Sequence, residues 1–329
     1  MVLILPFAVT EVENNLEFFL FLMGLVATII SGIFDFHLIV RILQNQLLYM
    51  ISGAVLFAGI LFKLFQDKIK VAIQDALKIM PLKFFIFLVV LILGLLSSII
   101  TAIIASLVLV EIINNLPLNR SNKVRLNIIA CFAIGLGAVL TPIGEPLSTI
   151  VIIKMDGSFT YLIEKVGKYI IPGILVASVL SVVMVGQGQS FATTINMVAE
   201  KEETYLGVII RAFKVFIFVM ALELLGAGFK PFIDTYIINL DSRILYWINM
   251  LSAVLDNATI AAAEVSPSMS DTQVQAVLMG LLVSGGMLIP GNIPNIISAG
   301  KLKIKSGEWA CLGLPLGLIG LVIYFLIIF

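Results

Sequence analysis

The chain has 329 residues, of which 60% are hydrophobic and only 12% are charged, and its mean hydropathy is +1.15. Soluble globular proteins carry about 25% charged residues, so this composition excludes an ordinary soluble protein and predicts a membrane protein. The formal net charge is zero. Nothing in the composition therefore indicates a nucleic-acid partner, and membrane lipid is the expected surrounding.

The beginning of the chain predicts two membrane spans, at residues 16–34 and 47–65. Each apolar run approaches the length of about 20 residues that a helix needs to cross the hydrocarbon core of a bilayer. In residues 66–80, Lys and Asp are interleaved with Ile, Val and Leu. That pattern is typical of a helix that lies in the membrane interface.

A re-entrant hairpin is expected at residues 84–113. This apolar run is too long for one span, and its middle carries the small polar residues Ser97, Ser98 and Thr101. We expect a helix that enters the membrane, turns at these residues and returns to the same side. Such a turn is tolerated where protein shields its backbone from lipid.

A helix broken by prolines is expected next, at residues 123–154. Pro142 and Pro146 cannot donate backbone hydrogen bonds, and both disturb a helix. In lipid such a break persists only where protein or a water-filled cavity satisfies the freed backbone groups. A span at residues 169–186 follows, and the polar composition of residues 187–204 predicts a linker.

The second half, residues 205–329, presents the same order of features. A span at 206–229 precedes a second hairpin at 244–265. A second broken helix at 274–299 then precedes a closing span at 309–329.

Two sequence matches relate the halves. Both broken helices contain Pro-x-x-x-Pro, at residues 142–146 and 290–294, and residues 251–257 (LSAVLDN) align with residues 96–102 (LSSIITA). Paired interruptions in corresponding places of two halves point to a transporter binding site. We therefore predict an all-α membrane protein with an inverted repeat, about seven transmembrane helices, two re-entrant hairpins and two broken helices. Its first half would cover residues 1–186.

The basic residues predict how this topology is oriented. Of the 20 Lys and Arg residues, 14 fall on one predicted face and 6 on the other. Cytoplasmic loops carry an excess of Lys and Arg. We therefore expect a multi-pass protein of the cell (inner) membrane, with its N-terminus in the cytoplasm and its C-terminus outside.

Acidic residues at the breaks and hairpin tips are the candidates for a binding site, since ionisable groups inside a membrane are costly and usually functional. Asp256 and Asn257 lie at the second hairpin tip, and Glu145 lies at the first break. Carboxylates that lie close together share protons, or a bound cation neutralises them. Sodium prefers oxygen ligands as other hard cations do, so these three residues are the candidate sodium ligands. Further candidates for ion or substrate binding are Thr141, Ser97, Ser98, Thr101, Asn292, Asn295 and Glu223.

Other interpretations of these residues stay open. Asp256 could cap the hairpin tip by bonding to its own backbone. Glu223 could lie near the outer interface or pair with Lys230. Glu111 and Glu264 are expected near the hairpin mouths, in contact with water.

The sequence around these residues resembles the ion-transporter superfamily, which includes arsenite permeases, NhaD-type sodium/proton antiporters and divalent-anion/sodium symporters. Residues 251–257 look like the S-A-x-x-D-N motif of the first two groups, and residues 141–146 (TPIGEP) look like their T-P-I-G-D-P motif. The closest resemblance is to a short, uncharacterised family of this group that is labelled as cation transporters.

This resemblance implies a homodimer in which the hairpins and broken helices form a transport domain that moves in elevator fashion against a scaffold. It also implies that Asp256, Asn257 and residues 141–146 bind the ion. The first hairpin departs from the antiporter pattern, because it has Ser97 and Ser98 where those relatives often repeat Asp-Asn. This departure puts a symmetric pair of ion sites in doubt.

The function that we expect is secondary active transport of cations, with sodium and protons competing for Asp256 and Glu145. The alternative is a sodium-coupled symporter of a small anion, such as a carboxylate, an oxyanion or bicarbonate, bound at helix N-termini. A channel or a structural membrane protein would have no evident use for paired broken helices. The sequence has no zinc-binding Cys/His spacing, phosphate-binding glycine loop or nucleophile motif, so we expect neither an enzyme nor a bound cofactor other than sodium.

Overall fold

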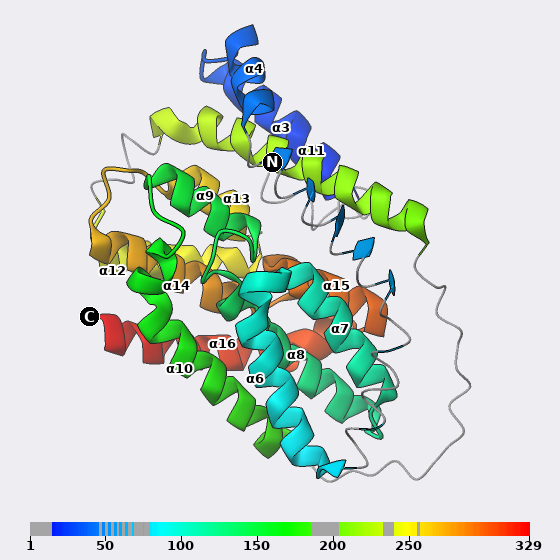
Figure 1. Ribbon diagram of the computed structural model, residues 1–329. Helices are drawn as coiled ribbons and strands as arrows, with labels where there is room; N and C mark the ends of the chain where they lie inside the picture. The colour runs from blue at the N-terminus through cyan, green and yellow to red at the C-terminus, as the bar shows by residue number, and fades with distance from the viewer. Residues whose placement is uncertain are drawn as a thin grey trace.

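The computed structural model describes residues 15–45, 79–185, 204–232, 240–254 and 257–329, with isolated positions between residues 48 and 75 (Figure 1). The regular elements of this part are helices, which confirms the prediction of an all-α protein. The predicted second span, interfacial helix and linker lie wholly or mostly outside the described residues.

The helices of the first half include one pair in each segment predicted as a hairpin or a broken helix. Thr101 alone separates α6 from α7. The segment between α8 and α9 contains Pro142, and Pro146 is the first residue of α9. The described helices are α3 (Leu16–Ile30), α4 (Phe36–Gln44), α6 (Leu82–Ile100), α7 (Ala102–Asn115), α8 (Arg120–Ala138), α9 (Pro146–Lys154) and α10 (Tyr161–Met184).

The second half begins with one long helix and continues with shorter ones. Its second hairpin segment holds α12, a 3-10 helix and α13, and its broken-helix segment holds α14, a second 3-10 helix and α15. The described elements are α11 (Tyr205–Phe232), α12 (Ser242–Ile248), η2 (Asn249–Ala253), α13 (Asn257–Glu264), α14 (Asp271–Gly285), η3 (Ile289–Gly291), α15 (Ile293–Leu302) and α16 (Ser306–Ile328).

Local sequence signals set several helix starts. The side chain of Asn119 accepts a hydrogen bond from the backbone N–H of Asn122 and caps α8. Ser270 and Gln273 form a capping box at the start of α14, an arrangement in which each side chain satisfies a backbone N–H of the other residue. Pro146 opens α9, where its missing N–H costs no helical hydrogen bond.

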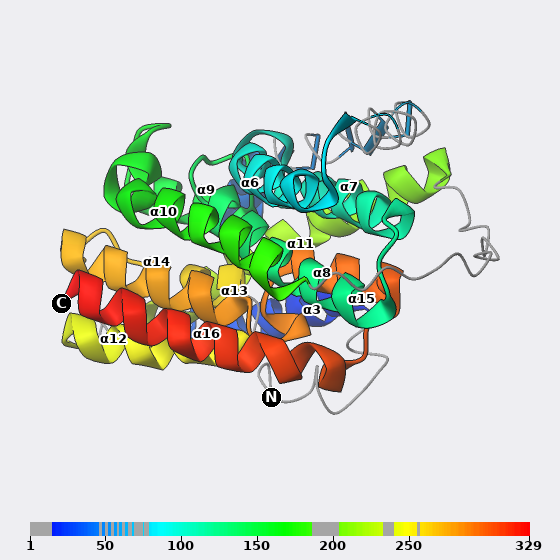
Figure 2. The same cartoon turned by 90° about the horizontal axis from the view of Figure 1, so that it is seen from below.

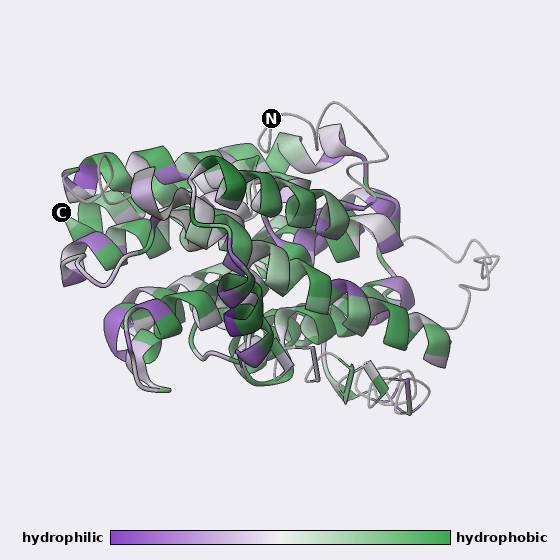
Figure 3. Ribbon diagram, turned by 90° about the horizontal axis from the view of Figure 1, so that it is seen from above, coloured by the Kyte–Doolittle hydropathy of each residue, from purple (hydrophilic) through white to green (hydrophobic). Residues whose placement is uncertain are grey.

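Three described helices, α6, α10 and α16, are long and apolar enough to cross a membrane. The apolar stretches of α3 and α7 are shorter. The prediction is about seven spans, and three of the described helices are both long enough and apolar enough. One of the three, α6, belongs to the segment predicted to turn back, because the chain turns at Thr101 and leaves a 19-residue helix before it. Figure 3 shows hydrophobic residues along most of the helices, as expected of a membrane protein.

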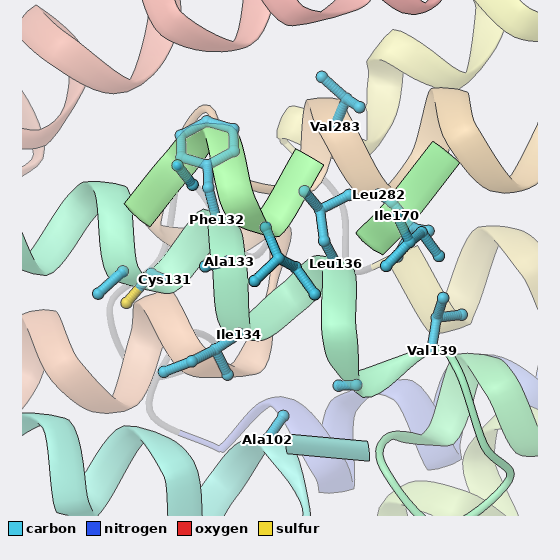
Figure 4. Packing of buried hydrophobic residues seen from close by; sticks show 14 of the residues in the cluster. Ala102, Cys131, Phe132, Ala133, Ile134, Leu136, Val139, Ile170, Leu282 and Val283 are labelled. Carbon is cyan, nitrogen blue, oxygen red and sulfur yellow. The ribbon is translucent and has the colours of Figure 1, made fainter. Parts of the chain in front are cut away.

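One large hydrophobic core joins the helices from α6 to α10 with those from α12 to α16. Figure 4 shows side chains of this core, among them Phe132 and Leu136 of α8, Ile170 of α10 and Leu282 of α14. In Figure 2, α14 lies between α10 and α16, and it contacts both.

The helices α3, α4 and α11 form a separate layer with small hydrophobic clusters of their own. Leu20 of α3 packs with Ala221 and Leu225 of α11, and Leu38 of α4 packs with Leu224 of α11. Figure 1 shows α3 and α11 side by side along one edge of the molecule. The layer meets the large core where α11 packs against α13.

Contacts within the large core are reciprocal between the halves. The second arm of the first hairpin, α7, packs against α15, and α9 packs against α13. Likewise α6 packs against α8, while α12 and η2 pack against α14. Each broken helix therefore contacts both hairpins.

Candidate functional site

The first break is hydrogen-bonded to the tip of the first hairpin. The Thr141 hydroxyl donates to the backbone carbonyl of Ser98, and the backbone N–H of Ala102 donates to the carbonyl of Gly144 over 2.8 Å. The Ser97 hydroxyl donates to the carbonyl of Ile134 in α8 over 3.0 Å. The break and the tip thus donate hydrogen bonds to each other, from Thr141 to the tip and from Ala102 to the break.

Thr101 forms the turn between α6 and α7 in an unusual backbone conformation. Its φ is +75°, in the region that a β-branched residue rarely adopts. Its hydroxyl accepts a hydrogen bond from the backbone N–H of Ile104 and caps α7. The bond from Ala102 to Gly144 holds the same turn against the break.

The second break is closed by one amide side chain. The Nδ2 atom of Asn295 donates to the carbonyls of Gly285 and Leu288, over 2.8 and 2.9 Å. Gly285 ends α14, and a Cβ atom added to it would lie 3.5 Å from the hydroxyl of Ser252 and 3.7 Å from the Nδ2 atom of Asn257. The second hairpin tip therefore lies against the second break, as the first tip lies against the first.

Glu145 and Asn292 hold equivalent positions at the two breaks. Each residue is the N-cap of the second half of a broken helix, with closely similar backbone angles (φ −156°, ψ 161° and φ −153°, ψ 148°). Neither side chain accepts a hydrogen bond from its own helix, although only 4% of Glu145 and 1% of Asn292 is exposed. Both residues thus occupy the N-cap position, but their buried side chains do not cap the helix that follows.

The second break and the tip of the first hairpin both lie close to the backbone of α8. A Cβ atom added to Gly135 would lie 2.5 Å from the Nδ2 atom of Asn292. Two residues later, a Cβ atom added to Gly137 would lie 2.9 Å from the hydroxyl of Ser97. Glycine is required here because backbone and polar groups come closer to α8 than a side chain would allow.

Buried oxygen atoms at the second break lack hydrogen-bond donors in the described part of the chain. They are the Oδ1 atoms of Asn292 and Asn295. Since both N–H groups of Asn295 point at carbonyls, the orientation of its amide is fixed and its Oδ1 atom is an acceptor. Amide and carbonyl oxygens are ligands of hard cations. Among the residues that the structure describes, no three His, Cys, Asp or Glu side chains gather as a metal-binding group.

The predicted site residues fall into two described groups. Ser97, Ser98, Thr101, Thr141 and Glu145 lie at the first break and its hairpin tip, whereas Asn257, Asn292 and Asn295 lie at the second. Asp256 lies outside the described residues, so its predicted role is untested.

Glu223 lies apart from both groups, on α11. The Nδ2 atom of Asn45, at the end of α4, donates to its carboxylate over 2.8 Å. The predicted alternative partner, Lys230, has its side chain outside the described residues. Glu223 therefore belongs to the contact between α11 and the end of α4, within the α11 layer.

The expectation that Glu111 and Glu264 contact water is wrong, because both residues are buried. Each carboxylate accepts a hydrogen bond from an Asn side chain, Asn115 for Glu111 and Asn249 for Glu264. The i, i+4 spacing of Glu111 and Asn115 could have indicated the first pair. The second pair joins two different helices, and no spacing rule predicts it.

Trp309 at the start of α16 is a further residue that sequence reasoning missed. Its side chain is fully buried, and the indole Nε1 donates to the carbonyl of Gly286 over 3.1 Å. This carbonyl follows the last residue of α14. The closing helix is therefore anchored directly to the second break.

Comparison with known proteins gives one family. A family model described as a protein of unknown function, DUF1646, matches residues 1–329. No curated protein matches the chain.

Proposed function

Since the chain belongs to the DUF1646 family, whose function is unknown, we propose that it is a secondary active cation transporter that exchanges sodium for protons across the cell membrane. The observation that carries this proposal is the pair of helix breaks, each hydrogen-bonded or packed against a hairpin tip and lined with buried oxygen atoms. Broken helices that meet inside a membrane protein expose backbone groups where an ion binds.

An inverted repeat is supported by matching contacts in the two halves. Ser97 and Ser252, which the sequence aligns, each donate to a carbonyl of the first half of the neighbouring broken helix, Ile134 and Leu281. The reciprocal packing of α7 on α15 and of α9 on α13 has the same symmetry. We infer that the two halves cross the membrane in opposite orientations, as the inverted repeats of many transporters do.

An elevator movement is supported by the separation of the hydrophobic clusters. The hairpins and broken helices share one core, whereas α3, α4 and α11 have small clusters of their own. In this proposal the large core carries the ion and slides against the α11 layer, and two copies of the chain form a homodimer. The N-terminus lies in the cytoplasm, as the basic residues predict.

Sodium would be bound by oxygen ligands at the breaks. Asp256 supplies the negative charge in this proposal, and Asn257, Glu145 and the amide oxygens of Asn292 and Asn295 complete the set. A proton competes for the carboxylates, because an unneutralised carboxylate in this setting is costly.

Transport in proteoliposomes tests the proposal. With a pH-sensitive dye inside and sodium added outside, the lumen should become alkaline as entering sodium drives protons out. Asp256→Asn should abolish this change, whereas Lys165→Ala, at an exposed ion pair with Asp271, should keep it. Full activity of Asp256→Asn, or a lumen that does not respond to sodium, would refute sodium/proton exchange.

A sodium-coupled anion symporter remains the second candidate, because of the N-termini of α9 and α15. The N-cap side chains of both helices accept no hydrogen bond from the first helical turn. The backbone N–H groups of that turn therefore have no side-chain cap, and such groups bind anions. Thermal stabilisation separates the two functions. An exchanger is stabilised by sodium alone, whereas a symporter gains further stability only when its anion is added with sodium.

A further inference from the structure

The second hairpin is joined near its base by a buried carboxyl–amide contact. The Nδ2 atom of Asn249, in η2, donates to the Oε1 atom of Glu264, at the end of α13, over 3.1 Å. Asn249 is fully buried and Glu264 is 4% exposed. The contact therefore connects the first arm of the hairpin with the second arm, inside the protein.

The orientation of the Asn249 amide is fixed by its hydrogen bonds. Its Nδ2 atom also donates to the carbonyl of Leu245 over 2.9 Å, so both N–H groups are used. Its backbone carbonyl accepts a hydrogen bond from Ser284 over 2.8 Å, which holds the residue against α14. The remaining atom, Oδ1, finds no donor in the described part of the chain.

No cation balances the Glu264 carboxylate among the described residues. The elements packed against α13 are α9, α11, η2 and α14. Charged or titratable side chains described on these elements, or at their ends, are Glu145, Lys154, Tyr205, Lys214, Glu223 and Asp271. Of these, Lys154 donates from its Nζ atom to the backbone carbonyl of Val265, the residue after Glu264.

If Glu264 were ionised, its carboxylate and the Oδ1 atom of Asn249 would be two buried acceptors. The Nδ2 atom of Asn249 would be the only donor in the pair. Burial of an unpaired charge and of an unsatisfied acceptor both cost free energy. A proton on the carboxyl removes the charge and supplies the missing donor. We propose that Glu264 and Asn249 form a proton-binding site, in which the protonated carboxyl and the amide pair through two hydrogen bonds and tie the arms of the second hairpin together.

This proposal rests on the proposed function and adds a second proton-binding position to it. The arms that the pair connects lead to the tip, where Ser252 and Asn257 lie against the second break. Loss of the proton would loosen the arms and change the oxygens offered to sodium. Proton and sodium would then be coupled through the hairpin, in addition to direct competition for one carboxylate.

The first hairpin provides a matched control. Glu111 is also buried and also contacts an Asn side chain, but Asn115 lies one turn away in the same helix. The Nδ2 atom of Asn115 donates to both the backbone carbonyl and the carboxylate of Glu111. This contact stays within α7 and joins no arms.

Infrared difference spectroscopy of the purified full-length protein tests the site without relying on transport. A protonated carboxyl has a C=O band that an ionised carboxylate lacks. We expect a band that titrates with pH in wild type and in Glu111→Gln, with the Glu264 contribution present in both. Glu264→Gln should lose that contribution, and it should still fold because the Gln amide can replace the paired acid. Asn249→Leu should shift the frequency of the band, because the C=O group loses its hydrogen bond.

Two results would overturn the proposal. They are an unchanged band in Glu264→Gln, and a Glu264 band that is unaffected by Asn249→Leu in a protein that unfolds at the wild-type temperature. If the Glu264 band titrates but sodium drives no proton flux, the exchanger is refuted and this site is supported. If sodium drives proton flux but the Glu264 band is absent, the exchanger is supported and this site is refuted.

Discussion

The close contact of α6 with α8 at Gly137 gives a prediction whose size follows from the structure. A Cβ atom added to Gly137 would lie 1.7 Å from the backbone carbonyl oxygen of Gly94 and 2.9 Å from the hydroxyl of Ser97. Carbon and oxygen atoms normally stay about 3.3 Å apart even in their closest contacts. Gly137→Ala therefore forces the two helices apart, since a backbone carbonyl cannot move as a flexible side chain can.

We expect Gly137→Ala to destabilise the protein by about 2–4 kcal/mol. Overpacking of a well-packed interior costs about 1–3 kcal/mol, and displacement of Ser97 from the carbonyl of Ile134 costs about 1 kcal/mol more. Thermal unfolding in detergent measures the change.

The control is Gly300→Ala, at an exposed position of α15 where an added Cβ atom would meet no atom within 4 Å. Because Ala has the higher helix propensity, this variant should be as stable as wild type or more stable, by up to about 1 kcal/mol. If Gly137→Ala unfolds at the same temperature as Gly300→Ala, α6 and α8 do not approach as closely as described.

Three further predictions concern hydrogen bonds and ion pairs. Asn295→Leu should lower stability by about 2–4 kcal/mol, because two buried carbonyls at the second break lose their donor, and chemical unfolding of the purified protein would show it. Thr141→Val should cost about 1–2 kcal/mol through loss of the donor to Ser98, whereas Thr141→Ser should recover most of that loss in the same assay. Lys165→Ala should leave the unfolding temperature unchanged, because its ion pair with Asp271 is exposed to solvent. A drop as large as that of Asn295→Leu would contradict this assessment.

The positions of the helix interruptions could be predicted from the sequence because proline acts locally. Pro142 and Pro146 remove backbone donors wherever the rest of the chain folds. The structure accordingly ends α8 at Ala138 and starts α9 at Pro146, and it ends α14 at Gly285 before the second pair of prolines.

Features that depend on tertiary contact could not be predicted in this way. The pairing of Asn249 with Glu264 requires two helices to fold against each other, and the sequence gives only the presence of an acid near a hairpin end. The same holds for Glu223, whose contact with Asn45 joins residues 178 positions apart. The positive φ of Thr101 is also set by its surroundings, since Thr has no local preference for that conformation.

The anchoring of Trp309 at Gly286 means that the protein carries its own optical reporter. Indole fluorescence responds to the loss of a hydrogen bond, and the chain has only one other tryptophan, Trp247, which is partly exposed. In Trp247→Phe, a change of emission on adding sodium would follow the second break itself, in unlabelled protein and in real time.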